Sequence, residues 1–470
     1  MNREMGRDFA RRRVTIIGLG REGVSLARFL ARQGAEVTVS DQRTEDQLGE
    51  NLAQVAGLPL RLSLGANRVE DVVGADIVFI SPGVPGDLPA VRAAEELGIP
   101  ISAETQLFFQ LCPAPILGVT GSSGKTTTTS LLGEVFRRAG RRVFVGGNIG
   151  VPLLDRLDEI TADSWVIMEL SSFQLERLTR SPHIGVITNI TPNHLDRHPT
   201  MEHYIEAKKN ILRYQGPDDY AVLNADNACT SSMAAESRAS VLLFSRLREV
   251  DSGAWLEDTK LMARWQGRYE EVCDREDILL RGEHNIENVL AVAAATIAAG
   301  LPLSAVRDAV RNFPGVEHRL EFVMEINGVQ YYNDSIATSP ERSLAAMRSF
   351  TEPIVLLAGG REKHLPLEEW ARTAIRRCRA VVLFGEAAPL LEKALDKARQ
   401  ELPDNACSVV VAASLEAAVK EAAQLACPGD VVLLSPACTS FDAFRDFEER
   451  GHAFKKLVGD LGSCRSFWVG

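Results

Sequence analysis

The sequence is poor in the features that mark metal-binding, disulfide-linked and membrane-spanning proteins. Its eight cysteines are scattered without a CxxC or CxxH pair. That spacing argues against a zinc site and a disulfide framework, and it favours a reduced, cytoplasmic interior. The longest bland apolar stretch, 289–301, is too short to span a bilayer and is expected to be a buried helix.

The chain also lacks an excess of positive charge. It carries 52 Lys and Arg against 63 Asp and Glu, a net charge of -11, which opposes binding to nucleic acid. The basic start, MNREMGRDFARRR, precedes an apolar run too short and too glycine-rich for a signal peptide, so a first strand and no membrane insertion are expected. A length of 470 residues is too great for one core and predicts two to four domains.

Short apolar, β-branched runs alternate with helical patterns, which predicts an α/β protein with largely parallel sheets. The expected strands are 14–19, 36–40, 76–82, 115–120, 165–170, 184–190, 220–224, 241–245, 353–360, 380–386, 408–414 and 430–436. Asn327-Gly328 is typical of a hairpin turn. We predict three α/β domains in series: a Rossmann-like domain at 1–104, a central phosphate-loop domain at 105–314 and a second Rossmann-like domain at 315–470.

A glycine-rich turn follows the first expected strand. Gly18, Gly20 and Gly23 have G-x-G-x-x-G spacing, and Asp41 closes the second strand. A tight turn, a helix N-terminus and a later acid are what a nucleotide phosphate or ribose site requires. The motif does not separate NAD from a UDP-sugar, so a dehydrogenase stays open, as does a turn with no ligand.

The segment TGSSGKTTTTS at 120–130 follows another strand and opens a helix pattern. Backbone N–H groups from Gly121 to Lys125 can hold phosphates, Lys125 can neutralise β/γ oxygens, and Thr126 can offer a hydroxyl to Mg²⁺. Val119 stands where the full phosphate-loop pattern has its first glycine, so this is a shortened form. A Gly/Ser turn with a chance lysine is the alternative.

Three further residues extend this site. Glu169 ends the apolar strand WVIMEL, His194 lies just past the strand at 184–190, and Lys208 lies in a helical stretch. Each has an ordinary explanation by itself: a cap partner, a loop residue and a solvated helix face. Their order after a phosphate loop, at or just beyond strand ends, instead favours a metal-assisted phosphoryl-transfer centre.

Nine segments resemble the Mur ligases, in order along the chain and over essentially all of it. They are TGSSGKTT, GGNIG, MELSSFQLE, TNITPNHLDRH, YIEAKKNI, GEHNIENVLA, GVEHRLE, NDSIATSP and LSPACTSFDAFRDFEERG. The resemblance implies ATP-dependent ligation of D-glutamate to UDP-N-acetylmuramoyl-L-alanine through an acyl phosphate. That reaction is a cytoplasmic step of peptidoglycan synthesis, which serves cell wall biogenesis, cell shape, the cell cycle and cell division.

The resemblance also implies cofactors, partners and alternatives. We expect ATP, two Mg²⁺ ions, a CO₂-derived carbamate on Lys208, and a monomer with no nucleic-acid partner. A sister Mur ligase, or the same ligase using L-glutamate, are the nearer alternatives. A dehydrogenase would not explain Lys125 and Glu169, and an inactive UDP-sugar sensor would not explain intact phosphate-loop and metal positions.

Site residues follow from the same resemblance, position by position. The expected catalytic residues are Lys125, Lys208, His194 and Glu169, and the expected metal ligands are Thr126, Glu169, His194 and Lys208 as its carbamate. Expected ATP contacts are Gly121, Ser122, Ser123, Gly124, Lys125, Thr126, Thr127, Asn288, Arg319 and Asp334, with His318 lining the site. Expected contacts to the UDP precursor are Gly20, Arg21, Glu22, Asp41, Gln42, Arg43, Ser81, Pro82, Gly83, Asn148 and His194. Expected contacts to glutamate are Thr338, Lys363, Ser440 and Phe441.

Two positions depart from the family pattern. Ser123 replaces the more usual asparagine of the loop, a mild change because backbone amides bind the phosphates. Ile336 replaces the usual lysine of the N-D-S-K-A-T segment and removes a cation from the glutamate side. Without that lysine, Lys363 must balance the negative charge of the substrate. Arg342 is the nearest cation in sequence that could compensate for the missing lysine.

Overall fold

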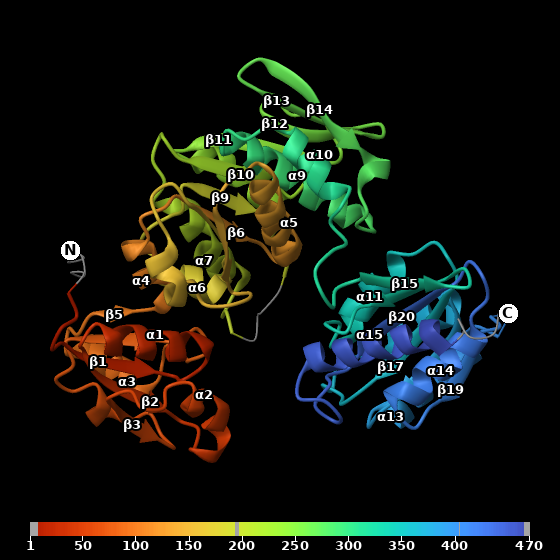
Figure 1. Ribbon diagram of the computed structural model, residues 1–470, viewed down its shortest axis with the longest axis horizontal. Coiled ribbons are helices and arrows are strands. Elements are labelled where there is room, and N and C mark those ends of the chain that lie inside the picture. Colours follow the sequence, from red (N-terminus) through yellow and green to blue (C-terminus); the bar gives the residue numbers. More distant parts are fainter. Residues whose placement is uncertain (1–7, 193–196, 404, 465–470) are drawn as a thin grey trace. The chain divides into compact units, whose positions relative to one another are not determined.

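The computed structural model describes residues 8–192, 197–403 and 405–464. They form two compact units. The first contains the chain as far as Asp277 together with Ile286–Arg311, and the second contains Ile278–Asn285 together with the chain from Asn312 onward. Each unit is described by itself below (Figure 1).

The first unit begins with a five-stranded parallel sheet of order β3-β2-β1-β4-β5 (red in Figure 1). Its strands are β1 Arg13–Ile17, β2 Glu36–Asp41, β3 Leu60–Leu64, β4 Ile77–Ile80 and β5 Ile101–Ser102. Its helices are α1 Arg21–Arg32, α2 Gly49–Ala53, α3 Pro89–Glu96 and α4 Glu104–Leu111. The carboxyl ends of β2, β1 and β4 are adjacent, so the segments that follow these three strands meet at one edge.

The same unit contains a nine-stranded sheet of order β14-β13-β12-β11-β10-β9-β6-β8-β7. Its strands are β6 Ile116–Thr120, β7 Val143–Gly147, β8 Trp165–Glu169, β9 Ile184–Ile187, β10 Tyr220–Asn224, β11 Ser240–Ser245, β12 Gly253–Glu257, β13 Lys260–Trp265 and β14 Arg268–Asp274. Its helices are α5 Lys125–Arg138, α6 Ser172–Glu176, α7 Met201–Arg213, α8 Ala228–Ser232, α9 Glu283–Ala298 and α10 Ser304–Val310. The central strands β6, β8 and β9 are parallel, and their carboxyl ends share an edge.

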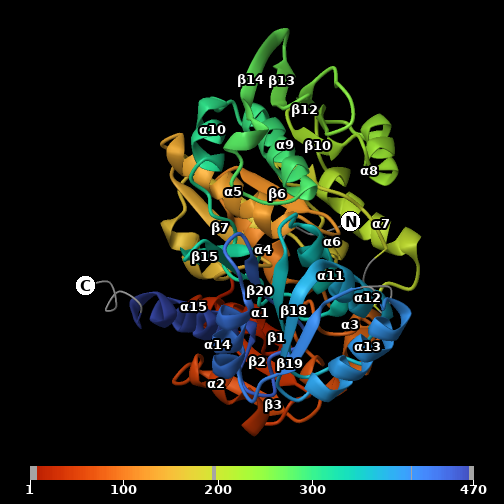
Figure 2. The same ribbon diagram turned by 90° about the vertical axis from the view of Figure 1, so that its right-hand side faces the viewer.

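The second unit is built on a six-stranded sheet of order β15-β16-β20-β17-β18-β19. Its strands are β15 Glu321–Ile326, β16 Val329–Asn333, β17 Ile354–Gly359, β18 Cys378–Phe384, β19 Ser408–Val411 and β20 Val431–Ala437. Its helices are α11 Pro340–Arg348, α12 Glu368–Arg377, α13 Ala388–Glu401, α14 Leu415–Leu425 and α15 Phe447–Cys464. Helices α14 and α15 pack on one face of the sheet, and α11, α12 and α13 pack on the other (Figure 2).

The three sheets confirm the predicted fold class, and each expected strand run contains an observed strand. The runs were recognisable because strands such as β4, β9 and β17 are buried along their whole length. The hairpin at Asn327-Gly328 joins β15 to antiparallel β16. The domain limits at 104 and 314 stay predictions.

Several strands were not expected. They are β3, β5, β7 and the antiparallel series β12, β13 and β14. The strands of that series include exposed polar residues, as in the first half of β14, and so lack the continuous apolar run that identified the others. The stretch at 289–301 does lie mostly in a buried helix, α9, as predicted.

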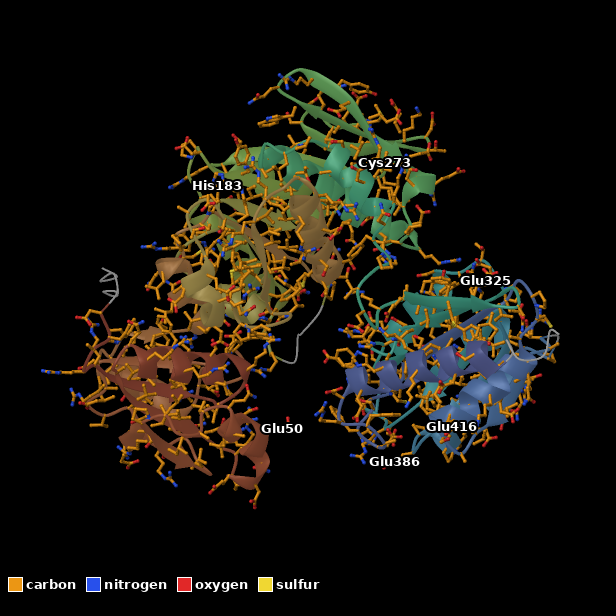
Figure 3. The ribbon with its side chains drawn as sticks, viewed as in Figure 1. Glu50, His183, Cys273, Glu325, Glu386 and Glu416 are labelled. Carbon is orange, nitrogen blue, oxygen red and sulfur yellow. The ribbon has the colours of Figure 1, made fainter. Side chains whose placement is uncertain are left out.

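Seven cysteines are free thiols, as their spacing predicted: Cys112, Cys229, Cys273, Cys378, Cys407, Cys427 and Cys438. Cys273, labelled in Figure 3, is buried on β14, and burial raises the pKa of its thiol to about 12. A thiol with so high a pKa stays protonated and unreactive at neutral pH. Within the part of the chain that the structure describes, no helix combines the length and apolar character needed to cross a membrane.

Candidate active site

The phosphate-loop-like segment lies between β6 and α5, at the carboxyl edge of the nine-stranded sheet. Gly124 caps α5 with a φ of 80°, a left-handed conformation that favours glycine. A Cβ at Gly124 would also collide with the side-chain oxygen of Asn288. The loop therefore needs glycine here both for its backbone angle and for the close approach of α9.

Two of the loop amides are already bonded. The Ser122 N–H donates to the Asn189 carbonyl at 2.9 Å, and the Ser123 N–H donates to the Asn189 side-chain oxygen at 3.0 Å. The expectation that the amides from Gly121 to Lys125 hold phosphate stays a prediction, and it would require these two amides to exchange their partners. The N–H groups of the first turn of a helix have no partner within the helix, and the N-terminus of a helix attracts an anion.

Two lysines converge on the same carbonyl. Lys125 Nζ donates to Gly121 O at 2.9 Å, and Lys208 Nζ, on α7, donates to that oxygen at 3.0 Å and to Thr120 Oγ1 at 3.2 Å. Lys208 is 1% exposed. Burial, with the neighbouring Lys125 charge, holds the pKa of Lys208 well below its usual value, against the opposing attraction of Glu169.

A carboxylate lies beside these lysines. Glu169, at the end of β8 and 2% exposed, accepts hydrogen bonds from Thr126 Oγ1 at 2.7 Å and from Asn148 Nδ2 at 2.8 Å. A carboxylate and a hydroxyl oxygen in contact are donors that suit Mg²⁺, so these residues fit the expected ion. The structure thus brings Lys125, Lys208, Thr126, Glu169 and Asn148 together, whereas His194 lies outside the described residues.

A cavity of about 400 Å³ opens at the carboxyl edge of the first sheet. All the first-domain residues expected to contact the UDP precursor line it: Gly20, Arg21, Glu22, Asp41, Gln42, Arg43, Ser81, Pro82 and Gly83. Asn67, Val84, Pro85 and Leu88 also line it and were not expected, because only the fold brings them to this edge. Three separate segments of the sequence therefore line one cavity.

Asp41 organises the rim of this cavity. Its carboxylate accepts the Leu19 N–H at 2.7 Å and is held by the Arg43 guanidinium at 2.8 Å. Burial would raise the pKa of Asp41, but the hydrogen bonds from Arg43 and Leu19 outweigh burial and hold the pKa below its usual value. The acid is therefore ionised at neutral pH and can accept hydrogen bonds from a ligand.

Arg21 connects the cavity to the nine-stranded sheet. Its guanidinium donates to the carbonyls of Gly150 at 3.0 Å and Gly147 at 3.1 Å, on the turn that carries Asn148. Asn148 in turn holds Glu169. A continuous series of hydrogen bonds therefore runs from the cavity rim to the Glu169 carboxylate.

Glu22, the residue after Arg21, is a buried acid in the lining of the same cavity. Its Oε1 accepts from Gln174 Nε2 at 2.7 Å, whereas its Oε2 is buried without a hydrogen-bond partner among the described residues. Burial raises the pKa of Glu22 to about 7, against the hydrogen bond from Gln174 and the Arg21 charge. Burial and the neighbouring Glu22 also raise the pKa of Glu104 well above its usual value.

The residues expected to contact glutamate gather on the second unit. Thr338 follows β16, Lys363 follows β17, and Ser440 and Phe441 follow β20, and these three strands are neighbours in the sheet. Lys363 Nζ donates to Thr338 Oγ1 at 3.2 Å. Backbone hydrogen bonds of 2.9 Å in both directions between Arg361 and Thr439 join the Lys363 loop to the Ser440 loop.

Two residues expected to contact ATP, Arg319 and Asp334, also belong to this unit. Asp334 is buried and accepts from Ser435 Oγ at 2.8 Å and from the Leu320 N–H at 3.2 Å. Burial raises the pKa of Asp334 to about 7, and these hydrogen bonds and the Arg319 charge oppose the rise. The remaining expected ATP contacts, including Asn288, lie in the first unit.

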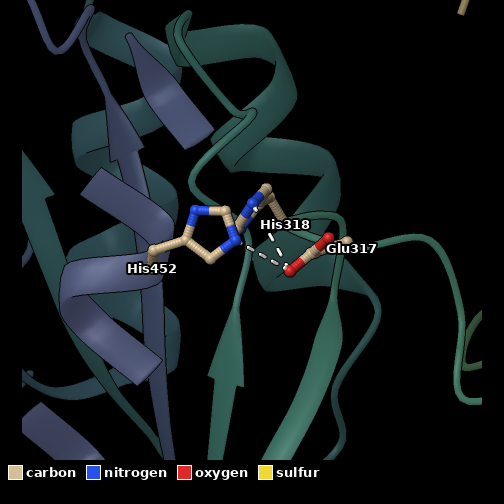
Figure 4. Close-up of side chains that lie close together, drawn as sticks. All are labelled: Glu317, His318 and His452. Carbon is tan, nitrogen blue, oxygen red and sulfur yellow. Dashed lines mark hydrogen bonds and ion pairs between the residues drawn. The ribbon is translucent and has the colours of Figure 1, made fainter. Parts of the chain in front are cut away.

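His318, expected to line the site, forms a cluster with Glu317 and His452 (Figure 4). The donors of this cluster do not suit a metal ion. The Asn333 side-chain N–H₂ donates to His318 Nδ1 at 2.8 Å, so the proton of the neutral ring lies on Nε2, which has no lone pair to offer. Lys455 already neutralises Glu317 Oε1 at 2.6 Å.

Family models match three segments of the chain. The Mur ligase MurD-like N-terminal domain matches residues 12–103, the Mur ligase middle domain matches 119–296, and the Mur ligase glutamate ligase domain matches 318–438. The chain belongs to the Mur ligase family. The predicted family and the ligase class are thereby confirmed.

Relatives of this Mur ligase share its full length. It is 46% identical over 453 residues to a Symbiobacterium thermophilum protein named UDP-N-acetylmuramoylalanine–D-glutamate ligase, covering 96% of this chain and 98% of the relative. An Acetivibrio thermocellus protein of the same name is 43% identical over 451 residues, with 96% of this chain and 97% of that protein covered.

Solved structures show that the fold is shared more widely. The UDP-N-acetylmuramate-alanine ligase of Thermotoga maritima is 20% identical with a TM-score of 0.59, covering 96% of this chain and 99% of that one. A pseudomurein peptide ligase type C of Methanothermus fervidus is 18% identical with a TM-score of 0.54, covering 96% and 100%. At these identities the likeness concerns the fold alone.

Some residues that hold the site of this Mur ligase were not predicted as site residues from the sequence. Asn189 and Thr188 hold the phosphate loop, and Gln174 holds Glu22, through contacts between segments far apart in the chain. Only Asn189 has a partial signal, because it lies just past a strand in the segment that contains His194. Pairwise contacts of this kind become visible only in the folded chain.

Proposed function

We propose that this Mur ligase joins D-glutamate to UDP-N-acetylmuramoyl-L-alanine, using ATP and releasing ADP and phosphate. The observation that carries the proposal is the 46% identity over 96% of the chain to a protein named for that reaction. The proposed setting is the cytoplasmic stage of peptidoglycan synthesis, with the enzyme acting as a monomer.

The chemistry must overcome repulsion between two anions. The precursor's carboxylate attacks the γ-phosphate of ATP, forming an acyl phosphate and ADP, and the amine of glutamate then displaces phosphate to form the amide. Lys125 and the first turn of α5 neutralise and orient the phosphates at the start of this sequence. Mg²⁺, held by Glu169 and Thr126, would supply further positive charge between the two anions when bound.

The first-domain cavity supports the choice of a UDP precursor. Its rim presents the ionised Asp41 and the cation Arg43, which match the hydroxyl or N–H donors and the diphosphate of a uridine nucleotide. Arg21 then links the occupied cavity to Asn148, near the carboxylate that must react. The third-domain residues Thr338, Lys363 and Ser440 are proposed to receive glutamate.

We also propose that Lys208 is carbamylated in the active enzyme. The buried amine has a lowered pKa and is held by Thr120 and Gly121, so its neutral form is accessible to CO₂. Attack of Nζ on CO₂ forms an N–C bond and releases one proton to solvent. The resulting carbamate is anionic and offers oxygen ligands suited to Mg²⁺.

Substrate panels test the proposed reaction. Phosphate release is measured with UDP-N-acetylmuramate, its L-alanyl form and longer precursors, each combined with D-Glu, L-Glu, D-Asp and L-Lys. Turnover is expected with the L-alanyl precursor and D-Glu only. A preference for L-Lys or for another precursor would contradict the proposed function and favour a sister ligase, and a preference for L-Glu would correct only the stereochemistry.

Chemical rescue tests the carbamate. Lys208→Ala is expected to be nearly inactive, and short carboxylic acids such as acetate are expected to restore part of its activity. Lys209→Ala is the matched control, because Lys209 is the next residue on α7 and its half-buried ammonium pairs with Glu206 and Glu236. Full activity of Lys208→Ala without an additive would rule the carbamate out.

A further inference from the structure

Two cations lie on one edge of the third sheet, close to Ile336. The Arg342 guanidinium, near the start of α11, donates to the Ile336 carbonyl at 3.3 Å. That same carbonyl accepts the Thr338 N–H at 2.8 Å, and the Thr338 hydroxyl accepts from Lys363 at 3.2 Å. Arg342 and Lys363 are thus joined through a short series of hydrogen bonds.

Among the described residues no acid forms an ion pair with Arg342 or Lys363, and the Arg342 charge acts only at a distance on the buried Asp334. Neighbouring arginines differ: Arg348, on the same helix, pairs with Glu369 at 2.7 Å, and Arg361 pairs with Glu386 at 2.8 Å (Glu386 is labelled in Figure 3). Neither Arg342 nor Lys363 has an ion pair with a described acid. Burial and the Arg342 charge lower the pKa of Lys363, as expected when two like charges are close without a counter-ion.

The nearby acids are committed elsewhere. Asp334 is buried and bonded to Ser435 and to the Leu320 amide, and its pKa of about 7 leaves it partly protonated at neutral pH. Asp442 accepts the Glu386 N–H at 3.2 Å. Two exposed cations held at fixed positions without acids are a surface that favours an anion with two negative groups.

We propose that Arg342 determines acceptor specificity by binding one carboxylate of a dicarboxylic amino acid while Lys363 binds the other. This inference rests on the proposed function and names the residue that replaces the cation missing at Ile336. Arg342 reaches the Ile336 carbonyl directly, so its charge lies at the backbone of the position where a lysine would otherwise stand. Thr338 and Ser440 add hydroxyl donors on the same edge.

The test is a set of Michaelis constants. Arg342→Ala is expected to raise the KM for D-Glu by about tenfold or more, because one carboxylate loses its partner, and to leave the KM for ATP and for the UDP precursor within about twofold. Arg342→Lys is expected to recover part of the loss. Arg348→Ala, the matched control on the same helix, is expected to behave as wild type.

A charge relocation sharpens the test. Ile336→Lys added to Arg342→Ala places a cation back on this edge and is expected to lower the KM for D-Glu again. D-Gln, which lacks the side-chain carboxylate, and the α-amide of D-Glu, which lacks the α-carboxylate, are each expected to be discriminated against by wild type. Arg342→Ala is expected to discriminate much less against one of the two. A merely structural role for Arg342 would not change this ratio.

Failures of the inference and of the proposed function are distinguishable. If wild type ligates D-Glu and Arg342→Ala keeps the same KM for it, the inference is wrong and the proposed function stands. If the KM for ATP rises as much as that for D-Glu, the cation serves the triphosphate and the inference is again wrong. If wild type does not ligate D-Glu at all, the proposed function itself fails.

Discussion

Two glycine-rich turns in the first unit occupy the same place in the fold but differ in the charged groups beside them. Each joins a buried parallel strand to a helix, at Gly18–Gly23 after β1 and at Gly121–Lys125 after β6. At the second turn, the Lys125 ammonium and the Lys208 amine both donate to the Gly121 carbonyl. At the first turn, the Asp41 carboxylate accepts the Leu19 amide instead.

The difference shows that the turn supplies geometry and the charge beside it selects the chemistry. Cations at the second turn can draw two anions together, as a phosphoryl transfer requires. An acid with a paired arginine at the first turn can bind hydroxyl or N–H donors beside a diphosphate, which requires no reaction. Four predictions test this comparison.

The largest effect is expected from Lys125→Ala. Removing the ammonium that faces the phosphates should lower kcat for phosphate release by about 100- to 1000-fold. Binding of the UDP precursor at the first turn should be unchanged, as measured by calorimetric titration. Lys209→Ala is the control, and a loss of less than about fivefold in Lys125→Ala would break the comparison.

The backbone of the two turns is compared by Gly124→Ala and Gly20→Ala. Gly124 has a φ of 80° and no room for a Cβ, so alanine there should destabilise the unit by about 1–3 kcal/mol and weaken ATP binding. Gly20 has a φ of −79° and nothing within 4 Å of an added Cβ, so its alanine variant should fold as wild type. Thermal unfolding of both variants checks this, and equal losses would show that the two turns are constrained alike.

The charge at the first turn is tested by Asp41→Asn. The amide side chain keeps the size of the acid but loses its charge, so the bonds from Arg43 and the Leu19 N–H weaken. The UDP precursor should bind about tenfold more weakly, the loss expected for one charge-assisted hydrogen bond. The KM for ATP should stay within about twofold, and an equal loss for ATP would mean that the two turns do not act independently.

The smallest expected effect is on the pH dependence of stability, to which Glu22 beside the first turn contributes. Its carboxyl has a pKa of about 7 in the folded chain against an ordinary value of 4.5, because burial disfavours the ionised form. The folded chain therefore binds more protons between these values, so this group's contribution to stability falls as the pH rises from about 4.5 to 7.

Glu22→Gln removes the titratable carboxyl group. The variant should unfold at a higher temperature than wild type, by about 2–6 °C at pH 7. The gap should grow from pH 4.5 to 7 and level off above pH 7. Exposed Glu36→Gln is the control. A gap that is constant with pH would show that Glu22 titrates normally.

The sequence predicted these turns because each depends on residue types at fixed spacing. It also predicted the hairpin at Asn327-Gly328, whose residues have φ values of 53° and 74°. The hairpin between β13 and β14 uses the same conformation at Gln266 and Gly267, with φ values of 48° and 76°. Glutamine rarely adopts that conformation, so residue types alone do not indicate this turn or the antiparallel strands beside it.

The active-site residues also divide into those that a sequence pattern predicted and those that it did not. Lys125, Thr126 and Glu169 were recognisable, because a loop pattern or a strand end marks them. The bonds from Asn189 to the loop amides and from Gln174 to Glu22 join residues far apart in the chain, and no spacing rule reports them. Roles at His194 stay predictions, since it lies outside the described residues.

The Arg21 hydrogen bonds to Gly147 and Gly150 have a consequence for substrate length. They tie the first-domain cavity to the turn beside Glu169, within one compact unit. The protein therefore fixes the distance between the cavity that binds the nucleotide and the place where the carboxylate of the precursor reacts. A precursor with a longer or shorter link between its nucleotide and its carboxylate could bind at either place alone. It could not occupy both places at the same time.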